Sequence, residues 1–335
     1  MSKRPTDTVI EHIKKGKIKD LQEYDLSELN LRDAQLKGCN LEGVNLHKAN
    51  LEGAGLEGAY LRDANLEGAN LQGANLLLAS LENTNLVGAN LRRANLKRAY
   101  LEGVSFEKAD LRGVDLEGSN LRGVNFERVN LEDANLCRAD FQKANLVGAN
   151  LEGAELQGAN FRKANLQAVN LEGTNLHEGN FQKANLEGAN LEGARLDYAK
   201  LQNANFQNAN LEGANLQFAD LHGVDLQGVN LWHANLRNAN FQNANLEGAE
   251  LQGANLYEGN FQKANFEGAN LEGAQLYAEL QKANFRNANL EGANIGHANL
   301  QGANFQKASL RGADFQLASG RANFEGADTE GALWQ

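Results

Sequence analysis

The sequence predicts an all-β fold, a four-sided parallel β-helix in which each side is one five-residue unit. From Leu26 to Leu276 every fifth residue is Leu or Phe, and the residue two positions earlier is nearly always small. A five-residue period fits neither a helix nor a straight strand, in which residues five apart point to opposite faces. Phenylalanines recur at multiples of twenty residues, which is four units. One such register holds Phe141, Phe161, Phe181, Phe241 and Phe261, and the adjacent one holds Phe106, Phe126, Phe206 and Phe266.

The first predicted element is an N-terminal cap segment, residues 1–20, with a short helix over residues 8–16. Thr8 and Glu11 suggest a capping box, and Gly16 suits the end of the helix. A solenoid needs such a cover because the backbone groups of its end coils would otherwise stay unpaired. The apolar stripe consists of Val9, Ile10 and Ile13. The alternative is a basic recognition arm made of Lys14, Lys15, Lys17 and Lys19.

Residues 21–335 are predicted to form a single β-helix of about sixteen coils, since no linker composition interrupts the repeat. Successive leucines can all point inward only if the chain bends once per unit. The bend is expected at the two residues after each Leu, where Gly is the commonest residue and tolerates positive φ. The small residue and the Leu or Phe then form the core, and the Asn points outward or into the turn.

The repeat is interrupted in its last quarter. In an 80-residue duplication, the segment LHEGNFQKAN from Leu176 recurs as LYEGNFQKAN from Leu256, and a single Tyr277 replaces Asp197 and Tyr198. One residue is therefore missing at Tyr277. Further slips are expected between Phe315 and Phe324 and between residues 329 and 333. These places predict distorted corners and a poorly formed last coil, where Leu333 and Trp334 either cover the end or meet a second copy.

The A-N-L-x-G units, such as Ala69-Asn70-Leu71-Gln72-Gly73, resemble the pentapeptide-repeat family. The resemblance implies a right-handed quadrilateral β-helix with the central Leu or Phe directed inward. It implies little about function, because the repeated residues are the structural ones. Some members of the family imitate the shape and charge of duplex DNA and inhibit or protect DNA gyrase. Those members commonly dimerise through C-terminal elements that are not evident in this sequence.

Composition narrows the function classes. The net charge of −11 argues against direct nucleic-acid binding, which needs clustered Lys and Arg, and favours a protein partner. Cys39 and Cys137 are too few for a disulfide framework. Neither an apolar signal region nor an 18-residue apolar run occurs, so we expect a cytoplasmic protein without a membrane partner.

The sequence contains no pattern that indicates catalysis, a metal or a cofactor. Its six histidines fall in different coils and registers, and no H-E-x-x-H, phosphate-binding loop or dinucleotide motif occurs. A convex fold with a filled centre offers no evident cleft in which a carboxylate pair could lose its water. We therefore expect a protein that is not an enzyme.

Two charged columns appear when the sequence is folded in steps of twenty. A lysine column is expected two corners away from an acidic column, and both are either a by-product of duplication or a surface that steers a basic partner. The acidic column contains Glu132, Glu152, Glu172, Glu192 and Glu212 and continues with Glu272 and Glu291 after Trp232 and Gln252. The lysine column contains Lys143, Lys163, Lys183, Lys263 and Lys282.

Large outward aromatic residues form a candidate protein-binding strip. Tyr198 and Phe218 share one corner register, Tyr277 is expected to return to that register, and Tyr257 lies one position before it. Trp232 interrupts the acidic column. Exposed aromatic residues are typical of interaction hot spots, although aromatic packing across adjacent coils would give the same pattern.

Three functions remain open at this stage. The first is a scaffold or regulator that presents its acidic and aromatic faces to a protein partner. The second is a DNA mimic that modulates DNA gyrase or another topoisomerase. The third is a passive spacer or a unit that assembles end to end, with a homodimer through the C-terminal end as one form of it.

Overall fold

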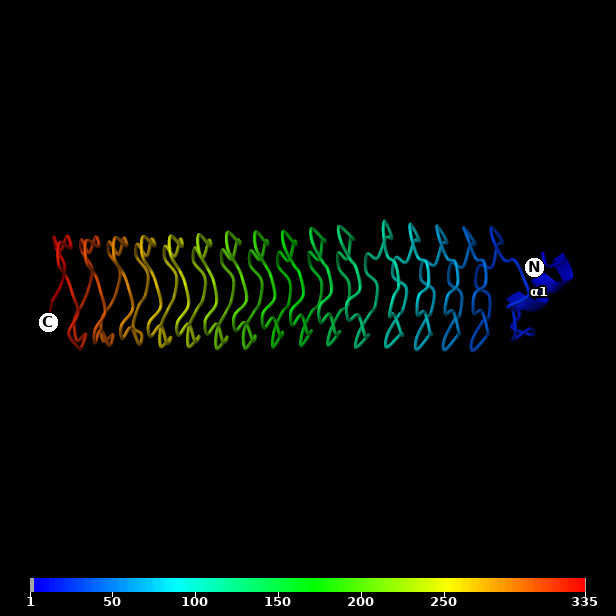
Figure 1. The fold of residues 1–335 in the computed structure, drawn as a ribbon, viewed down its shortest axis with the longest axis horizontal. Coiled ribbons are helices and arrows are strands. Elements are labelled where there is room, and N and C mark those ends of the chain that lie inside the picture. The colour runs from blue at the N-terminus through cyan, green and yellow to red at the C-terminus, as the bar shows by residue number, and fades with distance from the viewer. Residues whose placement is uncertain (1–2, 335) are drawn as a thin grey trace. The chain divides into compact units, whose positions relative to one another are not determined.

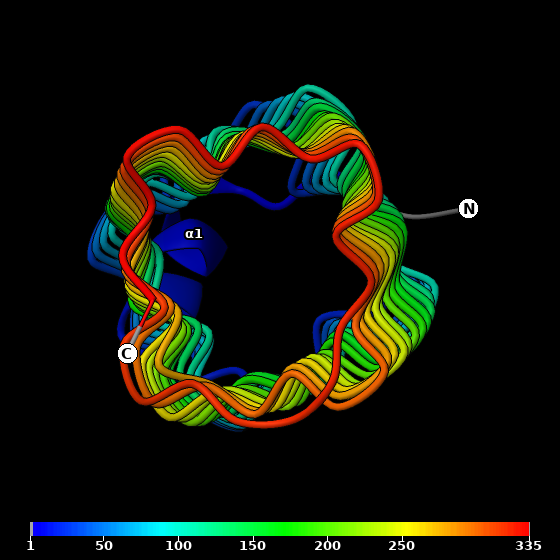
Figure 2. The same ribbon diagram turned by 90° about the vertical axis from the view of Figure 1, so that its left-hand side faces the viewer.

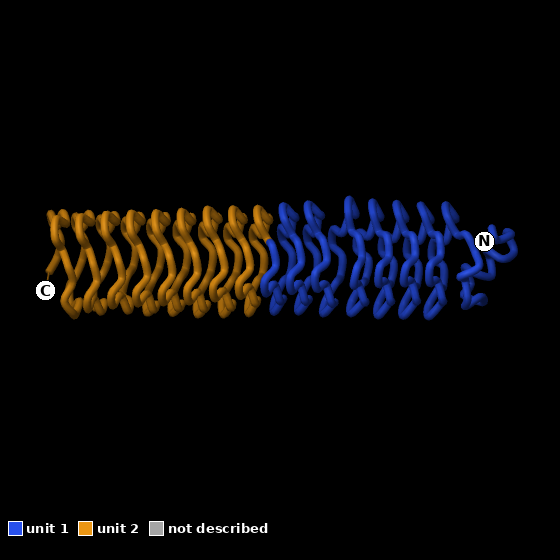
Figure 3. Tube along the Cα trace, viewed as in Figure 1, with its two compact units in different colours: residues 1–165 blue, residues 166–335 orange. Residues whose placement is uncertain are grey.

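The computed structural model describes residues 3–334 and divides the chain into two compact units. Unit 1 is Met1–Asn165 and unit 2 is Leu166–Gln335, as Figure 3 shows. Within the described residues the one helix is α1, Asp7–Lys14, at the N-terminal end of unit 1 (Figure 1). Everything else is turns and single-residue parallel β-bridges, so strands have no extended ranges. The continuity of one β-helix through residues 21–335 stays a prediction.

The predicted start of α1 was wrong. The helix begins at Asp7 after the N-cap Thr6, and the Thr6 side chain makes no capping hydrogen bond. Thr8 therefore lies inside the helix, where it cannot form a capping box with Glu11. The acidic Asp7 in the first turn compensates in part, because a negative charge there interacts favourably with the helix dipole.

The C-terminal end of α1 confirms Gly16 as the residue that ends the helix. Gly16 has a φ of 65° and its N–H donates to Ile13 O at 2.9 Å, while Lys17 N–H donates to His12 O at 3.0 Å. These two bonds define a Schellman motif. Ile13 is fully buried, and Gln35 N–H donates to Lys14 O at 2.8 Å, so α1 covers the first coil of unit 1.

Each coil has four sides, which Figure 2 shows end on. Parallel bridges join residues twenty apart, such as Asn50 with Asn70 in unit 1 and Asn190 with Asn210 in unit 2. In unit 2 the N–H of Leu211 donates to Asn230 O at 2.7 Å. The predicted twenty-residue coil is confirmed within both units.

The core of each unit is the predicted double row of inward side chains. The Leu or Phe of each regular unit and the small residue before it are buried, for example Ala209 and Leu211. Phenylalanines one coil apart stack directly, with centroids 4.7 Å apart for Phe141 and Phe161 and 4.8 Å apart for Phe241 and Phe261. Burial of these side chains supplies the main driving force for folding, at about 1.5–3 kcal/mol for each Leu or Phe before entropy is subtracted.

The corners are β-turns with one left-handed residue. In a representative corner, Ala214 N–H donates to Leu211 O at 3.0 Å, and Gly213 has a φ of 63°. Positive φ at the third residue alone is the pattern of a type II turn, which favours Gly. Tyr198 and Phe218 occupy the same position with φ values of 61° and 59°. Corner geometry therefore directs these large side chains away from the core.

The repeated Asn forms a side-chain ladder. In unit 2, Asn210 Oδ1 accepts from the Glu212 N–H at 3.2 Å and from Asn230 Nδ2 at 2.9 Å, and Asn210 Nδ2 donates to Asn190 Oδ1 at 3.3 Å. The side chain thus closes the local turn and also links three coils. The Asn side chain was expected to point outward or into the turn. It points into the turn and is partly buried between neighbouring coils.

The missing residue at Tyr277 is confirmed. Asn260 pairs with Glu279, a separation of nineteen, and Ala278 takes the buried position of the small residue. Glu258 N–H donates to Tyr277 O at 2.6 Å, so Tyr277 is the first corner residue and the left-handed second one has been lost. The same loss occurs after Gly320, where Gly302 N–H donates to Arg321 O at 2.6 Å.

The predicted slip between residues 329 and 333 was wrong, and so was the poorly formed last coil. Asp328 and Leu333 pair with Ser309 and Asp314, so the five-residue spacing is kept. Leu333 occupies the Asn column and is 51% exposed. Trp334 takes the inward position and stacks on Phe315 with centroids 4.5 Å apart, which covers part of the coil end.

One step of the ladder in unit 1 is widened. Residues 100 and 105 remain in register with residues 120 and 125. However, the backbone N–H groups of Leu101, Phe106 and Asn120, all within the described range, make no hydrogen bond of normal length across this step. Val104 and Val124 lie one coil apart in the small-residue column, where most units have Ala, and we attribute the wider step to their extra methyl groups. The Phe106 and Phe126 centroids are accordingly 5.2 Å apart.

Candidate functional site

The structure places four of the predicted aromatic residues on one corner of unit 2, in two clusters. In the first cluster Tyr198 stacks on Phe218, with centroids 4.9 Å apart and planes at 14°. Tyr198 is 52% and Phe218 47% exposed. The His177 ring, one coil earlier, makes a T-shaped contact with the Tyr198 ring, and the two centroids are 5.7 Å apart. Stacking thus fixes the rings without removing them from solvent.

A buried carboxylate supports the first cluster. Asp197 is only 8% exposed, and its Oδ2 lies 2.6 Å from His177 Nδ1. Arg195 Nε lies 3.7 Å from Asp197 Oδ1. This arrangement holds the imidazole against the Tyr198 edge. Sequence reasoning missed His177 and Asp197, although both lie in the twenty-residue register of the strip.

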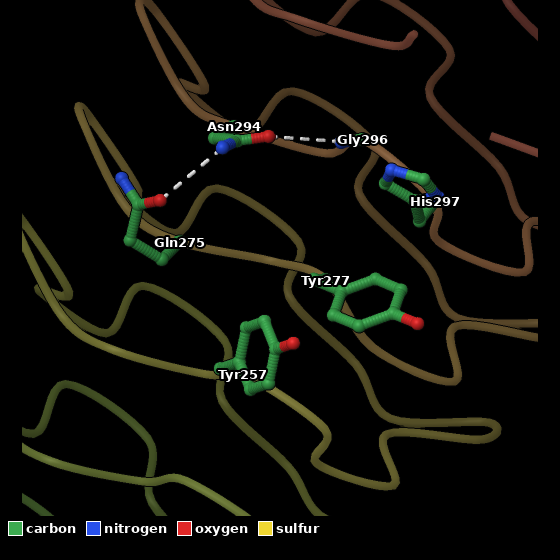
Figure 4. A pocket seen from close by; sticks show the side chains of 6 residues that line it. All are labelled: Tyr257, Gln275, Tyr277, Asn294, Gly296 and His297. Atoms are coloured by element: carbon green, nitrogen blue, oxygen red, sulfur yellow. Dashed lines mark hydrogen bonds between the residues drawn. The ribbon is translucent and has the colours of Figure 1, made fainter. Parts of the chain in front are cut away.

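The second cluster contains Tyr257 and Tyr277, whose centroids are 4.8 Å apart with planes at 58°. The His297 ring makes a T-shaped contact with the Tyr277 ring, with centroids 5.4 Å apart. Figure 4 shows these three rings. The Arg237 guanidinium lies over the Tyr257 ring at 4.9 Å and forms an ion pair with Glu258 at 3.4 Å. Sequence reasoning missed Arg237 and His297, which the same register would have revealed.

The register assigned to Tyr277 was wrong. It was expected at the left-handed position of Tyr198 and Phe218, but it occupies the preceding position, as Tyr257 does. The physical reason is the loss of the left-handed residue from this corner. Alignment with Tyr257 is what allows the two tyrosine rings to contact each other.

Trp232 lies on the neighbouring corner, in the acidic column after Glu212. It is 43% exposed, and its carbonyl oxygen accepts from Gly213 N–H at 2.8 Å. No ring among residues 3–334 stacks on its indole. The structure therefore brings Trp232 to the same side of unit 2 as the strip but leaves it outside both clusters.

The acidic column has a structural partner in unit 2. Glu172, Glu192 and Glu212 each accept a hydrogen bond from the Asn of the next coil, Asn190, Asn210 and Asn230, at 3.2, 3.3 and 3.3 Å. Each carboxylate therefore binds the outer side of the Asn ladder and still faces solvent on its other side. In unit 1, Glu132 and Glu152 hold the same corner position, and their carbonyl oxygens accept from Gly113 and Asp133 N–H.

The corners follow one another in a fixed order around each coil of unit 2. The residues after Leu191 form the acidic corner, those after Leu196 the aromatic corner, and those after Leu201 the corner of the lysine column. Lys183, Lys263 and Lys282 lie on that third corner with φ values of 59°, 60° and 60°. The aromatic residues therefore lie between columns of opposite charge.

Side chains that could ligate a metal ion are not gathered in the described part of the chain. No three His, Cys, Asp or Glu side chains among residues 3–334 are placed to hold a metal ion. Cys39 and Cys137 are both free, and burial raises the pKa of each thiol. Residues 3–334 contain no helix long and apolar enough to cross a membrane.

Comparison with known proteins identifies the repeat. The model described as pentapeptide repeats (8 copies) matches residues 25–63, 59–98, 79–118, 89–132, 119–158, 154–193 and 278–316. A second model, described as pentapeptide repeat region, matches residues 199–276. Together they extend over most of the chain. No curated protein matches.

Solved structures with similarity include HetL, a pentapeptide repeat protein involved in heterocyst differentiation regulation from Nostoc sp. strain PCC 7120. It is 29% identical, covers 78% of this chain and 87% of its own, and gives a TM-score of 0.16. A trypsin-treated variant of QnrB1, a plasmid-mediated fluoroquinolone resistance protein, is 20% identical, with coverages of 67% and 92% and a TM-score of 0.29. Rfr23 from Cyanothece 51142 is 27% identical, with coverages of 35% and 87% and a TM-score of 0.17.

Proposed function

Because the chain belongs to the pentapeptide-repeat family, whose repeated residues build cores and corners, we propose that its function lies in the departures from the repeat. The protein is a non-catalytic interaction scaffold or regulator that presents the aromatic and acidic corners of unit 2 to a protein partner. One observation carries this proposal. Tyr198 and Phe218 stack against each other while about half of each side chain stays in solvent.

Rigid, exposed aromatic rings are suited to protein recognition. They bury a large area on binding and lose little conformational entropy, because stacking has already fixed their rotamers. Packing across coils alone would also produce the stack, so the capture experiment below has to separate the two explanations. Trp232, on the neighbouring corner, adds a third large ring to the same side.

The acidic column supports a partner with a basic surface. Its carboxylates follow one corner coil after coil in unit 2, and they adjoin the aromatic corner. A regular array of one sign raises the rate of encounter with an oppositely charged protein and favours its correct orientation. The aromatic residues would then supply the contacts that persist in the complex.

Affinity capture with a matched pair of variants tests the proposal. The first variant replaces Tyr198, Phe218 and Trp232 by Ser, and the control replaces Tyr60, Leu78 and Tyr100, which are similarly exposed in unit 1. We expect partners bound by the wild type to be lost with the first variant and kept with the control, while both retain a β-rich circular dichroism spectrum. Equal capture by all three proteins would contradict the assignment.

The acidic column also favours a second candidate, the DNA mimic. Glu172, Glu192 and Glu212 keep solvent-facing carboxylate oxygens at regular coil spacing, as a phosphate backbone does. A mimic of this kind would alter DNA supercoiling by gyrase at micromolar concentration, and replacement of the three glutamates by Gln would abolish the effect. Unchanged supercoiling with the wild-type protein would remove this candidate.

Exposed apolar residues in the last coil favour self-association as a third candidate. Leu317, Leu333 and Trp334 all stay exposed beside the Phe315 stack. A homodimer through this surface would show a concentration-dependent mass in light scattering. Replacement of Leu317 and Leu333 by Asp would then give a constant monomer mass.

A further inference from the structure

Tyr277 separates two hollows on the aromatic corner of unit 2. The first, about 370 Å³, is lined by Tyr257, Tyr277, His297 and the neighbouring Gln275, Asn294 and Gly296, as Figure 4 shows. The second, about 200 Å³, is lined by Tyr277 and His297 together with Glu258, Ala278 and Glu279. The first hollow contains no Asp, Glu, Lys or Arg side chain, whereas the second carries two carboxylates.

The lost corner residue creates both hollows. Tyr277 is the whole corner between Leu276 and Ala278, so no following side chain covers its ring. In the next coil Gly296 occupies the position after Ile295, so this corner position adds no side chain to the hollow that Tyr277 lines. The Asn294 amide is held in place, since its Oδ1 accepts from Gly296 N–H at 3.0 Å and its Nδ2 donates to Gln275 Oε1 at 3.3 Å. The walls of the site are therefore preorganised.

The chain already shows what such a corner binds. Tyr257 lies one coil before Tyr277, and the Arg237 guanidinium lies 4.9 Å from the centre of the Tyr257 ring and 3.4 Å from Glu258. This is a cation–π contact completed by a carboxylate. Tyr277 lines the second hollow together with Glu258 and Glu279. Glu258 pairs with Arg237, whereas Glu279 accepts from the Gln281 side-chain amide and forms no salt bridge within the described residues.

We propose that Tyr277, Glu258 and Glu279 form a subsite for an arginine side chain of a partner protein, which would bind as Arg237 binds to Tyr257. This inference rests on the proposed function, since it names the chemistry by which a protein partner is recognised. Arginine fits better than lysine because its planar guanidinium stacks on a ring and donates to two carboxylates at once. The first hollow, which Tyr277 also lines, leaves room for the partner's backbone to reach the Gln275 amide.

The subsite can be tested on the isolated full-length protein by NMR with ring-labelled tyrosine at pH 7.5. The probes are Nα-acetyl-arginine N-methylamide and the same compound with citrulline, which has a similar shape and no charge. The Tyr277 signal is identified from a Tyr277→Phe variant. Glu279→Gln tests the carboxylate, and Glu291→Gln, an exposed glutamate of the acidic column, is the matched control.

We expect the arginine probe to shift the Tyr277 signal in a saturable way and the citrulline probe to bind at least about fivefold more weakly. Glu279→Gln should weaken arginine binding by a similar factor, and Glu291→Gln should leave it unchanged. Equal binding of the two probes, no saturable shift, or unchanged affinity in Glu279→Gln would overturn the subsite. Partner capture that still depends on Tyr198, Phe218 and Trp232 would leave the proposed function standing in that case.

Discussion

The Tyr198 and Phe218 rings lie 4.9 Å apart, nearly parallel, although both residues adopt a left-handed backbone conformation that disfavours their side chains. Stacking between coils is the interaction that offsets this strain. A double-mutant cycle with Tyr198→Ala and Phe218→Ala should therefore show a favourable coupling of about 0.5–1.5 kcal/mol. Urea denaturation of the wild type, both single variants and the double variant measures it. Additive effects would show that the rings do not stabilise each other.

The left-handed corner position can be probed without a steric complication at Gly268. Its φ is 67°, and a Cβ added there would meet nothing within 4 Å. Gly268→Val should lower the free energy of unfolding by about 1–2 kcal/mol, because a β-branched residue is strained at positive φ. Gly268→Asn should cost less, since Asn tolerates this conformation. Equal losses in thermal or urea denaturation would contradict the turn assignment.

The Asn ladder predicts a difference between two replacements of Asn210. Asn210→Ala removes two acceptor interactions and two donor interactions and should destabilise the protein by about 1–3 kcal/mol. Asn210→Asp keeps both acceptor roles, as Asp220 does where it accepts from His222 N–H at 3.2 Å and Asn240 Nδ2 at 3.0 Å. Urea denaturation should rank the Asp variant between wild type and Ala. If the Ala variant were as stable as the wild type, the Asn ladder would not contribute to stability.

Asp110 makes part of the stability dependent on pH. The Arg112 guanidinium donates to its two carboxylate oxygens at 2.8 and 2.5 Å and holds the pKa of Asp110 below its ordinary value of 3.8. A lowered folded-state pKa contributes stability above the unfolded value, and this contribution is lost as the pH falls through the folded pKa. Asp110→Asn should therefore destabilise at pH 7, by about 0.5–1 kcal/mol after solvent screening. The difference should shrink below pH 3.8. A difference independent of pH in urea denaturation would exclude this linkage.

The widened step in unit 1 predicts rapid hydrogen exchange. The amides of Leu101 and Phe106 should exchange faster than that of Leu121, which donates to Asp140 O at 2.9 Å in a regular step. Val124→Ala removes the methyl groups to which we attribute the wider step and should slow exchange at both amides. Mass spectrometry of peptides from residues 100–130 measures this. Protection at Leu101 and Phe106 equal to that at Leu121 would show that the step is closed in solution.

The sequence was sufficient for most of the fold. The five-residue period predicts the four sides, the inward Leu or Phe with its small partner, and the turn after each Leu. In a straight strand successive leucines would point to opposite faces, and one bend in every unit turns them all inward. The helix and the slips were predicted less well. The start of α1 was placed at Thr8 because a capping-box pattern is local, whereas the structure starts the helix at Asp7. The slip predicted between residues 329 and 333 failed because Thr329 replaces the expected Leu in an unbroken frame.

The candidate site was predicted as a set of exposed aromatic residues, but its organisation was not. The strip was predicted from large apolar residues alone, so its polar partners were not included. These partners lie on the same corner: His177, Asp197, Arg237 and His297. The missing corner residue was visible in the sequence, but its position within the corner was not. That position determines whether Tyr277 aligns with Phe218 or with Tyr257.

What the sequence determined by itself is therefore the periodic part of this protein: the coil, the core, the corners and the columns of charge. Repetition makes each of these a local property, fixed within five or twenty residues. Tertiary structure alone decided which rings stack, how Arg237 lies on Tyr257, that the acidic side chains cap the Asn ladder, and where the ladder opens at Val104. These depend on side-chain directions and distances between coils, which no local period encodes.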